Sequence, residues 1–468
     1  LGAVRDLSLI KKVGENMANE SKRLGIQFNF APVIDINTNP KNPIIGNRSF
    51  GEDKVNVTEH AIALMEGVQS KGVFSTGKHF PGHGDTATDS HYALPLVNFS
   101  KSRIDKTELY PYKRMFDEGL VSVMVGHLNI PSLEPKENIP TTASYNVVTK
   151  VLQEELGFDG LIFTDALNMK AASKFLAPGD LDLETFMAGN DILLFPENVP
   201  LAIQKITAAY NENRITNNRL ERSVKKILKY KFKSGLNNLK PIDLNNLNKD
   251  LITTSKDALQ YQLFEHAVTV VKNENNILPI KNLNQKIAYV KLGDDVNSTF
   301  VNTLKKYTEI TEIQSDNIDS LNVQLKSFNT VIVGFHKSDK AWKKHDFTET
   351  ELVWLQEIAK NNTVILDAFT KPYSLSTISD FSNIKAVVVS YQNADIAQEV
   401  SAQLLFGAIE SQGKLPVSIK SEFPVNHGIE FEKINRLGFT APENVGMSNE
   451  ILSQIDNIAN KAISQKMT

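Results

Sequence analysis

Short apolar runs rich in β-branched residues alternate with helical stretches over residues 1–234, and this alternation constrains the fold most strongly. Consecutive strands separated by a helix need a crossover connection, so they pair in parallel. The pattern predicts an α/β domain over residues 1–234. We expect strands at 27–34, 72–76, 121–126, 160–164 and 191–195, and helices at 54–71, 106–118, 145–156 and 201–234.

Chemically active residues stand where several of these strands end, namely Asp35, Lys78, His79, His127 and Asp165. An open sheet concentrates its site at one switch point, whereas a (β/α) barrel brings the carboxyl ends of all its strands to one face. We therefore predict a (β/α)8 TIM-type barrel. About five of the eight strands are recognisable, so we expect the barrel to be N-terminally truncated here, lacking its first strands.

A second α/β unit is predicted after an Asn-rich linker at 235–253. This unit covers 254–420, and residues 421–468 form a tail and the start of something further. Its expected strands are 268–272, 287–291, 330–334, 363–367 and 386–390, and its expected helices are 348–360 and 395–409.

Composition excludes several classes of partner. Lys and Arg number 51 against 54 Asp and Glu, without a basic patch, so nucleic acid is not expected. No run approaches the roughly 20 apolar residues of a membrane span. Cysteine is absent, which removes disulfides and thiolate chemistry. The chain begins and stops within helical patterns, so we expect a fragment in which any signal peptide is not visible. The sequence does not indicate the oligomeric state.

The segment KHFPGHGDTATDSHYALP at 78–95 is the strongest candidate for a functional site. Its GHGDTA part matches a dinucleotide fingerprint, although two nearby aspartates would face the pyrophosphate. A metal site is a second interpretation, weakened because the histidines lie on Pro- and Gly-rich backbone. A sugar site is the third. In the sugar site, Lys78 and His79 would bind hydroxyls and an Asp–His pair would transfer protons. The candidate metal ligands of the second interpretation are His79, His83, Asp85, Asp89 and His91.

Asp165 and Arg48 each have a functional and a structural interpretation. Asp165 ends an apolar strand, where its carboxylate either reaches the rim of a barrel or caps the following helix. Arg48 lies in a Gly- and Asn-containing loop, where its guanidinium either binds a substrate or pairs with Glu52 or Asp53.

Taken together, the segments 29–36, 45–53, 78–91, 163–169 and 188–194 resemble glycoside hydrolase family 3. The long motif KHFPGHGDTATDSH is similar to that of the family's β-N-acetylglucosaminidase branch. Segments 267–280 and 402–419 resemble the family's α/β sandwich domain. Residues 438–463 resemble the opening of a β-lactamase-like serine hydrolase domain.

The resemblance implies a role for each matching residue. It makes Asp165 the nucleophile, His91 the general acid/base and Asp89 the partner of His91. Lys78, His79 and Arg48 would hold the sugar's hydroxyls, with no metal and no cofactor. Imidazole titrates near pH 6.5, so it suits both donation and acceptance of a proton at neutral pH.

The activity that the resemblance implies is that of a retaining exo-β-N-acetylglucosaminidase. It would release terminal β-linked N-acetylglucosamine (GlcNAc) from muropeptides or chitooligosaccharides through a covalent glycosyl-enzyme. Three alternatives stay open: a β-GlcNAc phosphorylase, another family 3 β-glycosidase, and a non-catalytic sugar-binding scaffold. The family favours a periplasmic or secreted protein, and its acidic Gly-Gly-Arg strand would precede Leu1.

The same motif predicts a moving loop. Asp89 and His91 would swing over the bound sugar, with Gly82 and Gly84 as pivots, while His83 belongs to the loop's own structure.

Overall fold

The computed structural model describes residues 1–87, 93–340 and 343–467, which form two compact units. One unit contains residues 10–251, and the other contains residues 252–468 with residues 3–9. We call them the barrel unit and the sandwich unit and describe each by itself.

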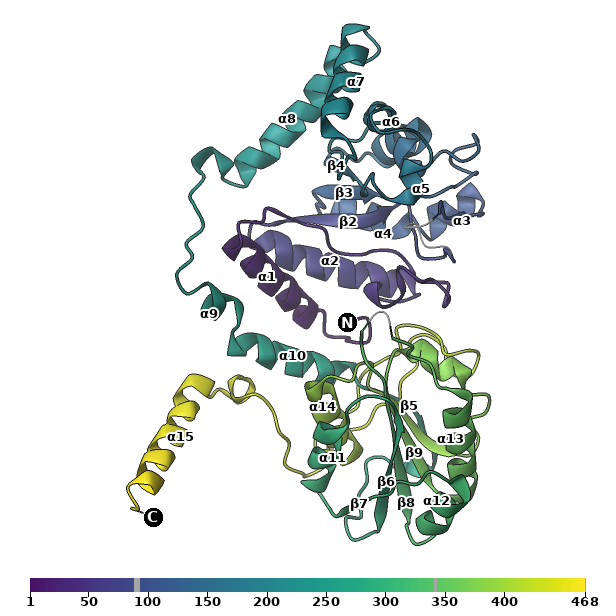
Figure 1. Cartoon of the computed structure of the whole chain (residues 1–468), viewed down its shortest axis with the longest axis vertical. Coiled ribbons are helices and arrows are strands. Elements are labelled where there is room, and N and C mark those ends of the chain that lie inside the picture. Colours follow the sequence, from purple (N-terminus) through teal and green to yellow (C-terminus); the bar gives the residue numbers. More distant parts are fainter. Residues whose placement is uncertain (88–92, 341–342, 468) are drawn as a thin grey trace. The chain divides into compact units, whose positions relative to one another are not determined.

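Four parallel strands in chain order form the sheet of the barrel unit (Figure 1). They are β1 (Phe28–Asn29), β2 (Phe74–Phe80), β3 (Ser122–Val125) and β4 (Leu161–Thr164). The predicted strand at 191–195 is reduced to a single parallel bridge between Ile192 and Phe163. The order expected of a barrel is thus present, since each strand pairs with its successor.

The helices of the barrel unit precede, connect and follow these strands in the chain. They include α1 (Leu7–Arg23), α2 (Lys54–Ser70), a π-helix (Asn146–Glu155), α5 (Lys170–Ser173) and α6 (Asp180–Ala188). The helix predicted over 106–118 is wrong in extent: α3 (Lys101–Lys106) and α4 (Tyr110–Asp117) are separate, because Pro111 begins a new helix. The predicted 201–234 helix is likewise two, α7 (Val199–Asn211) and α8 (Asn217–Lys233). The chain turns through Asn213 with positive φ, and Thr216 caps α8.

Aromatic rings fill part of the barrel unit's core. Phe28 lies with its ring centroid 5.0 Å from that of Phe74 and 5.3 Å from that of Phe163. Tyr230 of α8 packs edge-on against Phe74 at 5.2 Å. Edge contacts of this kind are favourable beyond the area that they bury, so they fix α8 against the sheet.

The sandwich unit is a six-stranded sheet between two layers of helices (Figure 1). Five parallel strands are joined by β5 (Thr269–Asn273), which runs antiparallel to β10 (Ile384–Val389). Helices α12 (Ile318–Leu325) and α13 (Glu349–Asn361) pack on one face. On the other face pack α10 (Thr254–Ala267), α11 (Ser298–Lys305) and α14 (Asp395–Leu405). The remaining strands are β6 (Ile287–Gly293), β7 (Ile310–Glu312), β8 (Thr330–His336), β9 (Val364–Phe369) and β10 (Ile384–Val389).

The predicted linker is partly ordered on the barrel unit. Arg23 donates to the carboxylate of Asp250 at 2.8 Å and to the carbonyl of Asn245 at 2.7 Å. The predicted linker also contains the short helix α9 (Leu247–Leu251). Arg23 therefore holds this stretch against α1.

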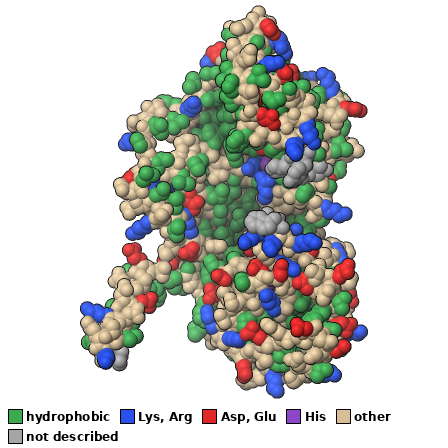
Figure 2. Space-filling view, viewed as in Figure 1, with side chains coloured by type: hydrophobic (Ala, Val, Ile, Leu, Met, Phe, Trp, Pro, Cys, Tyr) green, Lys and Arg blue, Asp and Glu red, His purple; other side chains and the backbone are tan. Residues whose placement is uncertain are grey.

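Several helices leave apolar side chains exposed. Figure 2 shows apolar side chains gathered on one face of the barrel unit. On α8, Leu228 and Phe232 are 58% and 67% exposed. Helix α15 (Asn449–Ser464), near the C-terminus, has no buried residue at all. Among the described residues, no helix combines the length and apolarity needed to cross a membrane.

Candidate active site

Asp165 stands directly after β4, at the carboxyl end of the sheet. Its carboxylate Oδ1 accepts a 2.8 Å hydrogen bond from the backbone N–H of Ala166. Burial would raise the pKa of Asp165, but the rings of His79 and His127, this N–H and the ammonium of Lys78 outweigh burial and lower it. Asp165 is therefore an anion at neutral pH, as a nucleophile or an electrostatic stabiliser must be.

His127 supports the backbone beside Asp165 as a neutral imidazole. Its Nε2 lies 3.0 Å from the carbonyl oxygen of Ala166, which can only accept, so the proton is on Nε2. Its Nδ1 then accepts from the hydroxyl of Thr142 at 2.8 Å. Burial lowers the pKa of His127 against the attraction of Asp165, so the neutral form persists at pH 7.

Lys78 lies near the end of β2, where one cation, Arg48, and two carboxylates act on it electrostatically. Burial and the charge of Arg48 lower the pKa of Lys78, while Asp165 and Asp35 oppose this shift. Among the described residues, no acceptor lies within hydrogen-bonding distance of its Nζ. Its ammonium is thus available to a substrate hydroxyl.

Arg48 is exposed, in a 3-10 turn at Gly46–Arg48. Its guanidinium donates to the carbonyl of Ile44 at 3.4 Å. Asp53, one of its two predicted salt-bridge partners, instead caps α2 by accepting from the N–H of Asn56. Arg48 affects Lys78 electrostatically, which places these two cations in the same site.

A buried carboxylate, Asp35, organises the histidines. Its Oδ2 lies 2.8 Å from Nδ1 of His79, and its Oδ1 accepts from the backbone N–H of His83 at 2.7 Å. Burial would raise the pKa of Asp35, but the charge and hydrogen bond of His79 and the contacts to His83 lower it. An ionised Asp35 fixes the proton of His79 on Nδ1, so Nε2 is the atom left to face a ligand.

The start of the loop after β2 is anchored. Asn42 donates to the carbonyls of His83 and Gly84 at 2.9 and 3.0 Å, and Thr38 donates to the carboxylate of Asp85 at 2.8 Å. A Cβ on Gly84 would lie 1.8 Å from the carbonyl oxygen of Ile36. Gly84 thus serves close packing of two backbones, which speaks against its predicted role as a pivot.

Gly82 is also tightly packed. It has a φ of +141°, and a Cβ there would lie 2.8 Å from Cβ of Glu108. The segment from Gly82 to Thr86 is therefore anchored. His83 belongs to this anchored part, with Nδ1 2.7 Å from the hydroxyl of Thr86, as its predicted loop role requires.

Asp89 and His91, the predicted partner and general acid/base, lie outside the described residues. The structure therefore brings together Asp165, His79, Lys78 and Arg48 of the predicted set. Within the described ranges, no group of three His, Asp or Glu side chains is arranged to hold a metal ion.

The segment AGNDILL at 188–194 has a structural task. Asp191 accepts from the backbone N–H of Ile162 at 3.1 Å and from the hydroxyl of Ser223, and its Oδ2 lies 3.2 Å from Nζ of Lys226. Ser223 and Lys226 belong to α8, so Asp191 ties that helix to β4. This carboxylate is completely buried and serves packing rather than substrate binding.

The sequence pattern placed Asp35 at a strand end without assigning it a role in the site, and it missed Thr142. Asp35 follows an apolar run, in the same pattern that singled out Asp165. That signal was sufficient to find it. Thr142 lies in a 3-10 turn, Thr141–Ala143, with no local pattern that would connect it to His127.

Two family profiles match the chain in order. The glycosyl hydrolase family 3 N terminal domain matches residues 1–230, and the C-terminal domain matches residues 268–439. Beta-hexosaminidase A from Pseudoalteromonas piscicida is 28% identical over 463 residues, covering 87% of this chain and 76% of that protein. Beta-hexosaminidase LpqI from Mycobacterium tuberculosis is 32% identical over 235 residues, covering 48% of this chain and 60% of that protein. The chain spans between half and two thirds of the length of LpqI and of several other relatives.

Solved structures agree with this family. A glycoside hydrolase family 3 beta-N-acetylglucosaminidase from Paenibacillus sp. superposes with a TM-score of 0.73 at 28% identity, covering 89% of this chain and 81% of that one. The beta-glucoside phosphorylase BglX superposes with a TM-score of 0.75 at 22% identity, covering 90% and 79%, which shows the fold alone. The predicted class, a TIM-type barrel followed by an α/β sandwich, is confirmed. This chain is a glycoside hydrolase and belongs to family 3.

Proposed function

We propose that this enzyme is a retaining exo-β-N-acetylglucosaminidase that removes terminal β-linked GlcNAc from muropeptides or chitooligosaccharides. The observation that carries the proposal is the Asp165 carboxylate, held ionised among Lys78, His79 and His127 at the end of parallel strands. Relatives named beta-hexosaminidase and beta-N-acetylglucosaminidase support this choice of sugar.

In the first step of the proposed mechanism, the Asp165 carboxylate attacks the anomeric carbon. The bond to the leaving oxygen breaks, and His91 gives that oxygen a proton while Asp89 stabilises the imidazolium. The product is a covalent glycosyl-enzyme.

In the second step, His91 takes a proton from water, which attacks the anomeric carbon and breaks its bond to Asp165. Two displacements retain the anomeric configuration. Lys78, Arg48 and Nε2 of His79 bind the sugar's hydroxyls in both steps.

The experiment measures hydrolysis of an aryl β-GlcNAc by the wild type, Asp165→Ala and His91→Ala. We expect both variants to lose on the order of 10³-fold or more in kcat. Asp159→Ala is a matched control, because Asp159 is exposed just before β4, at the opposite end of the strand from Asp165. That variant should keep wild-type turnover.

Azide tests the role of Asp165 directly. In Asp165→Ala, azide can occupy the vacated space and attack the anomeric carbon, giving the α-glycosyl azide by a single displacement. Restored turnover with the α-product supports Asp165 as the nucleophile. Full activity of Asp165→Ala without azide, or faster cleavage of β-glucoside than of β-GlcNAc, would contradict the proposal.

The acceptor is tested by adding phosphate to the wild type. We expect free GlcNAc as the product with and without phosphate. GlcNAc 1-phosphate as the main product would instead identify a phosphorylase.

We further propose the domain boundaries 1–234, 235–253, 254–420 and 421–468, with the last segment opening a β-lactamase-like serine hydrolase domain. Helix α10 supports the start at 254, since Tyr261 belongs to the sandwich unit's core. The exposed Ile451, Ile455 and Ile458 of α15 support a helix that packs within a further domain. A longer chain that hydrolyses a serine-reactive ester, and loses this on deletion of the added part, would support this assignment.

A further inference from the structure

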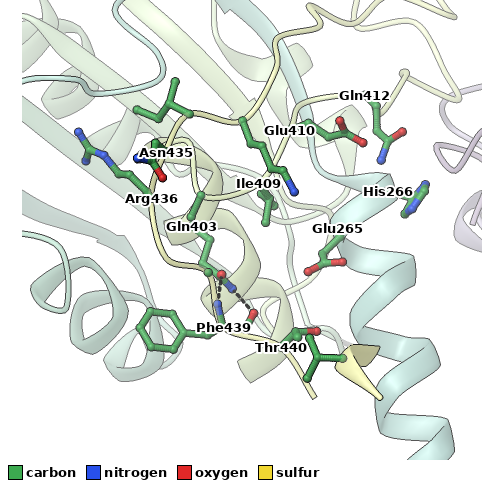
Figure 3. Close-up of a pocket in the computed structure, with 15 residues that line it drawn as sticks. Glu265, His266, Gln403, Ile409, Glu410, Gln412, Asn435, Arg436, Phe439 and Thr440 are labelled. Carbon is green, nitrogen blue, oxygen red and sulfur yellow. Dashed lines mark hydrogen bonds between the residues drawn. The ribbon is translucent and has the colours of Figure 1, made fainter. Parts of the chain in front are cut away.

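A polar pocket in the sandwich unit lies apart from the residues of the candidate active site. It has a volume of about 690 Å³, within the usual range for small-molecule sites. Its walls come from the end of α10, the loop at 408–412 after α14, and the segment 433–445. Figure 3 shows Glu265, His266, Glu410 and Gln412 on one side, with Asn435 and Arg436 on the other.

The wall of this pocket is built by specific hydrogen bonds. The fully buried Gln403 donates to the hydroxyl of Tyr261 at 2.7 Å and accepts from the backbone N–H of Phe439 at 2.6 Å. Asn444 donates to the carbonyl of Ala258 at 3.1 Å, and Ile434 N–H donates to Gly407. The segment 433–445 is thus fixed on α10 and α14, and the pocket is preformed.

Two opposite charges of this pocket are not used by the fold. Glu265 is about half-buried, and Lys433 is close enough to act on it electrostatically. Among the described residues, neither side chain has a partner within 4.0 Å in an ion pair or within hydrogen-bonding distance. Burial raises the pKa of Glu265 to about 7, against the opposing charge of Lys433. A carboxyl group in this state gains most from a ligand that brings a cation.

The geometry points to a binding site for a short peptide with free ends, held by its ammonium at Glu265 and by its carboxylate at Lys433. Such a ligand completes both unpaired charges at once, which neither a neutral sugar nor a simple anion can do. Ile409, Ile434 and Val445 also line the pocket and can contact small aliphatic side chains. This site does not depend on the proposed glycosidase activity.

The test is calorimetric titration of the whole chain with the dipeptide alanyl-alanine. We expect millimolar or tighter binding, at least tenfold weaker for Glu265→Gln and at least fivefold weaker for Lys433→Met. Glu432→Gln is the matched control, because Glu432 is an exposed acid next to Lys433 that does not line the pocket. It should bind within twofold of the wild type.

The pH dependence gives an independent measurement. Lys433 acts on Glu265 electrostatically, and Tyr261 lies on the same helix as Glu265. His266, Glu410 and Arg436 are the other charged or titratable groups that line the pocket. Burial lowers the pKa of His266, so its charge changes at lower pH than that of Glu265. Affinity should therefore rise about fivefold from pH 6 to pH 7.5, as Glu265 ionises, and this rise should vanish in Glu265→Gln.

Three outcomes would overturn the site. One is no heat of binding at about 10 mM dipeptide. Another is equal binding of a dipeptide blocked at both ends, or undiminished binding by Glu265→Gln and Lys433→Met. The third is tighter binding of chitobiose at the same residues, which would make this a sugar site. None of these measurements involves turnover, so loss of glycosidase activity would leave the result interpretable.

Discussion

At the scale of single residues, the site depends on Asp35, a carboxylate that does not itself need to touch the sugar. It is buried, and it receives Nδ1 of His79 and two backbone N–H groups. A group in this position sets which nitrogen of His79 carries the proton. Under the proposed function, Asp35 is therefore a positioning residue for the His79 imidazole.

Asp35→Asn should lower kcat/KM on aryl β-GlcNAc by on the order of 10²-fold. The amide that replaces the carboxylate carries N–H donors of its own, so it cannot accept all the hydrogen bonds from His79 and His83 that orient the imidazole. The lowered pKa also gives a sign for stability. The carboxylate stabilises the fold above its ordinary pKa of about 3.9, and this contribution is lost as pH falls through the lowered value. The acid limb of the stability curve should therefore flatten in Asp35→Asn.

Asp117→Asn is the matched control, since Asp117 is an exposed acid at the end of α4. Denaturation at several pH values checks both variants. Wild-type kcat/KM in Asp35→Asn would show that His79 is oriented by other contacts.

Several site residues could be predicted from the sequence because each stands at or just after the carboxyl end of a strand. Lys78, His79 and Asp165 belong to this group, and the structure brings them together. Asp35 carried the same signal but lacked a recognised role. Contacts such as that of Thr142 with His127 depend on how a separate turn packs, which no local pattern specifies.

At the scale of elements, Asp191 ties helix α8 of the barrel unit to its sheet. The carboxylate is buried between β4 and α8, where Ser223, Lys226 and the N–H of Ile162 all donate to it. Replacing one member of a buried charged network leaves the others without partners, which costs more than the pair contributes.

Asp191→Asn should therefore lower the stability of the barrel unit by about 3–5 kcal/mol, since Lys226 would keep its charge while only 13% exposed. Glu221→Gln is a control on the same helix, because its pair with Lys225 is exposed to solvent and contributes little to stability. Scanning calorimetry of both variants measures the difference. Equal melting temperatures would mean that α8 is held by its apolar contacts alone.

Long periodic segments of the fold were predicted well, whereas short elements and breaks were not. The helix expected at 54–71 is observed at Lys54–Ser70, because Asp53 caps its start. Strand β7 was missed, since only one of its three residues is buried and the alternation is too short to detect. The break before α8 depends on Asn213, which has a positive φ, and on Thr216, which caps the helix. Apolar residues continue at helical spacing on both sides of this break, so one long helix was predicted.

At the scale of the whole molecule, the chain forms two packed units. The segment that follows them, residues 433–467, belongs to neither hydrophobic core. Up to Val445 this segment lines the pocket and is hydrogen-bonded to α10 through Asn444. Beyond Gly446, α15 keeps an apolar face in which Ile451, Ile455 and Ile458 are 67%, 58% and 69% exposed. Burial, not helicity, is what stabilises most helices in proteins.

Deletion of residues 447–468 should therefore leave the melting temperature within about 1 °C of the full chain, because it removes no buried apolar area. A longer deletion that begins at Thr440 is the comparison. It also removes Asn444, whose contacts to Gln262 and Ala258 fix the segment on α10, and each kcal/mol lost should shift the transition by about 2–4 °C. If the shorter deletion alone lowers the melting temperature, the apolar face of α15 must be packed in solution. Because such packing between copies depends on protein concentration, repeating the scan at two concentrations would then distinguish a second copy from an intramolecular contact.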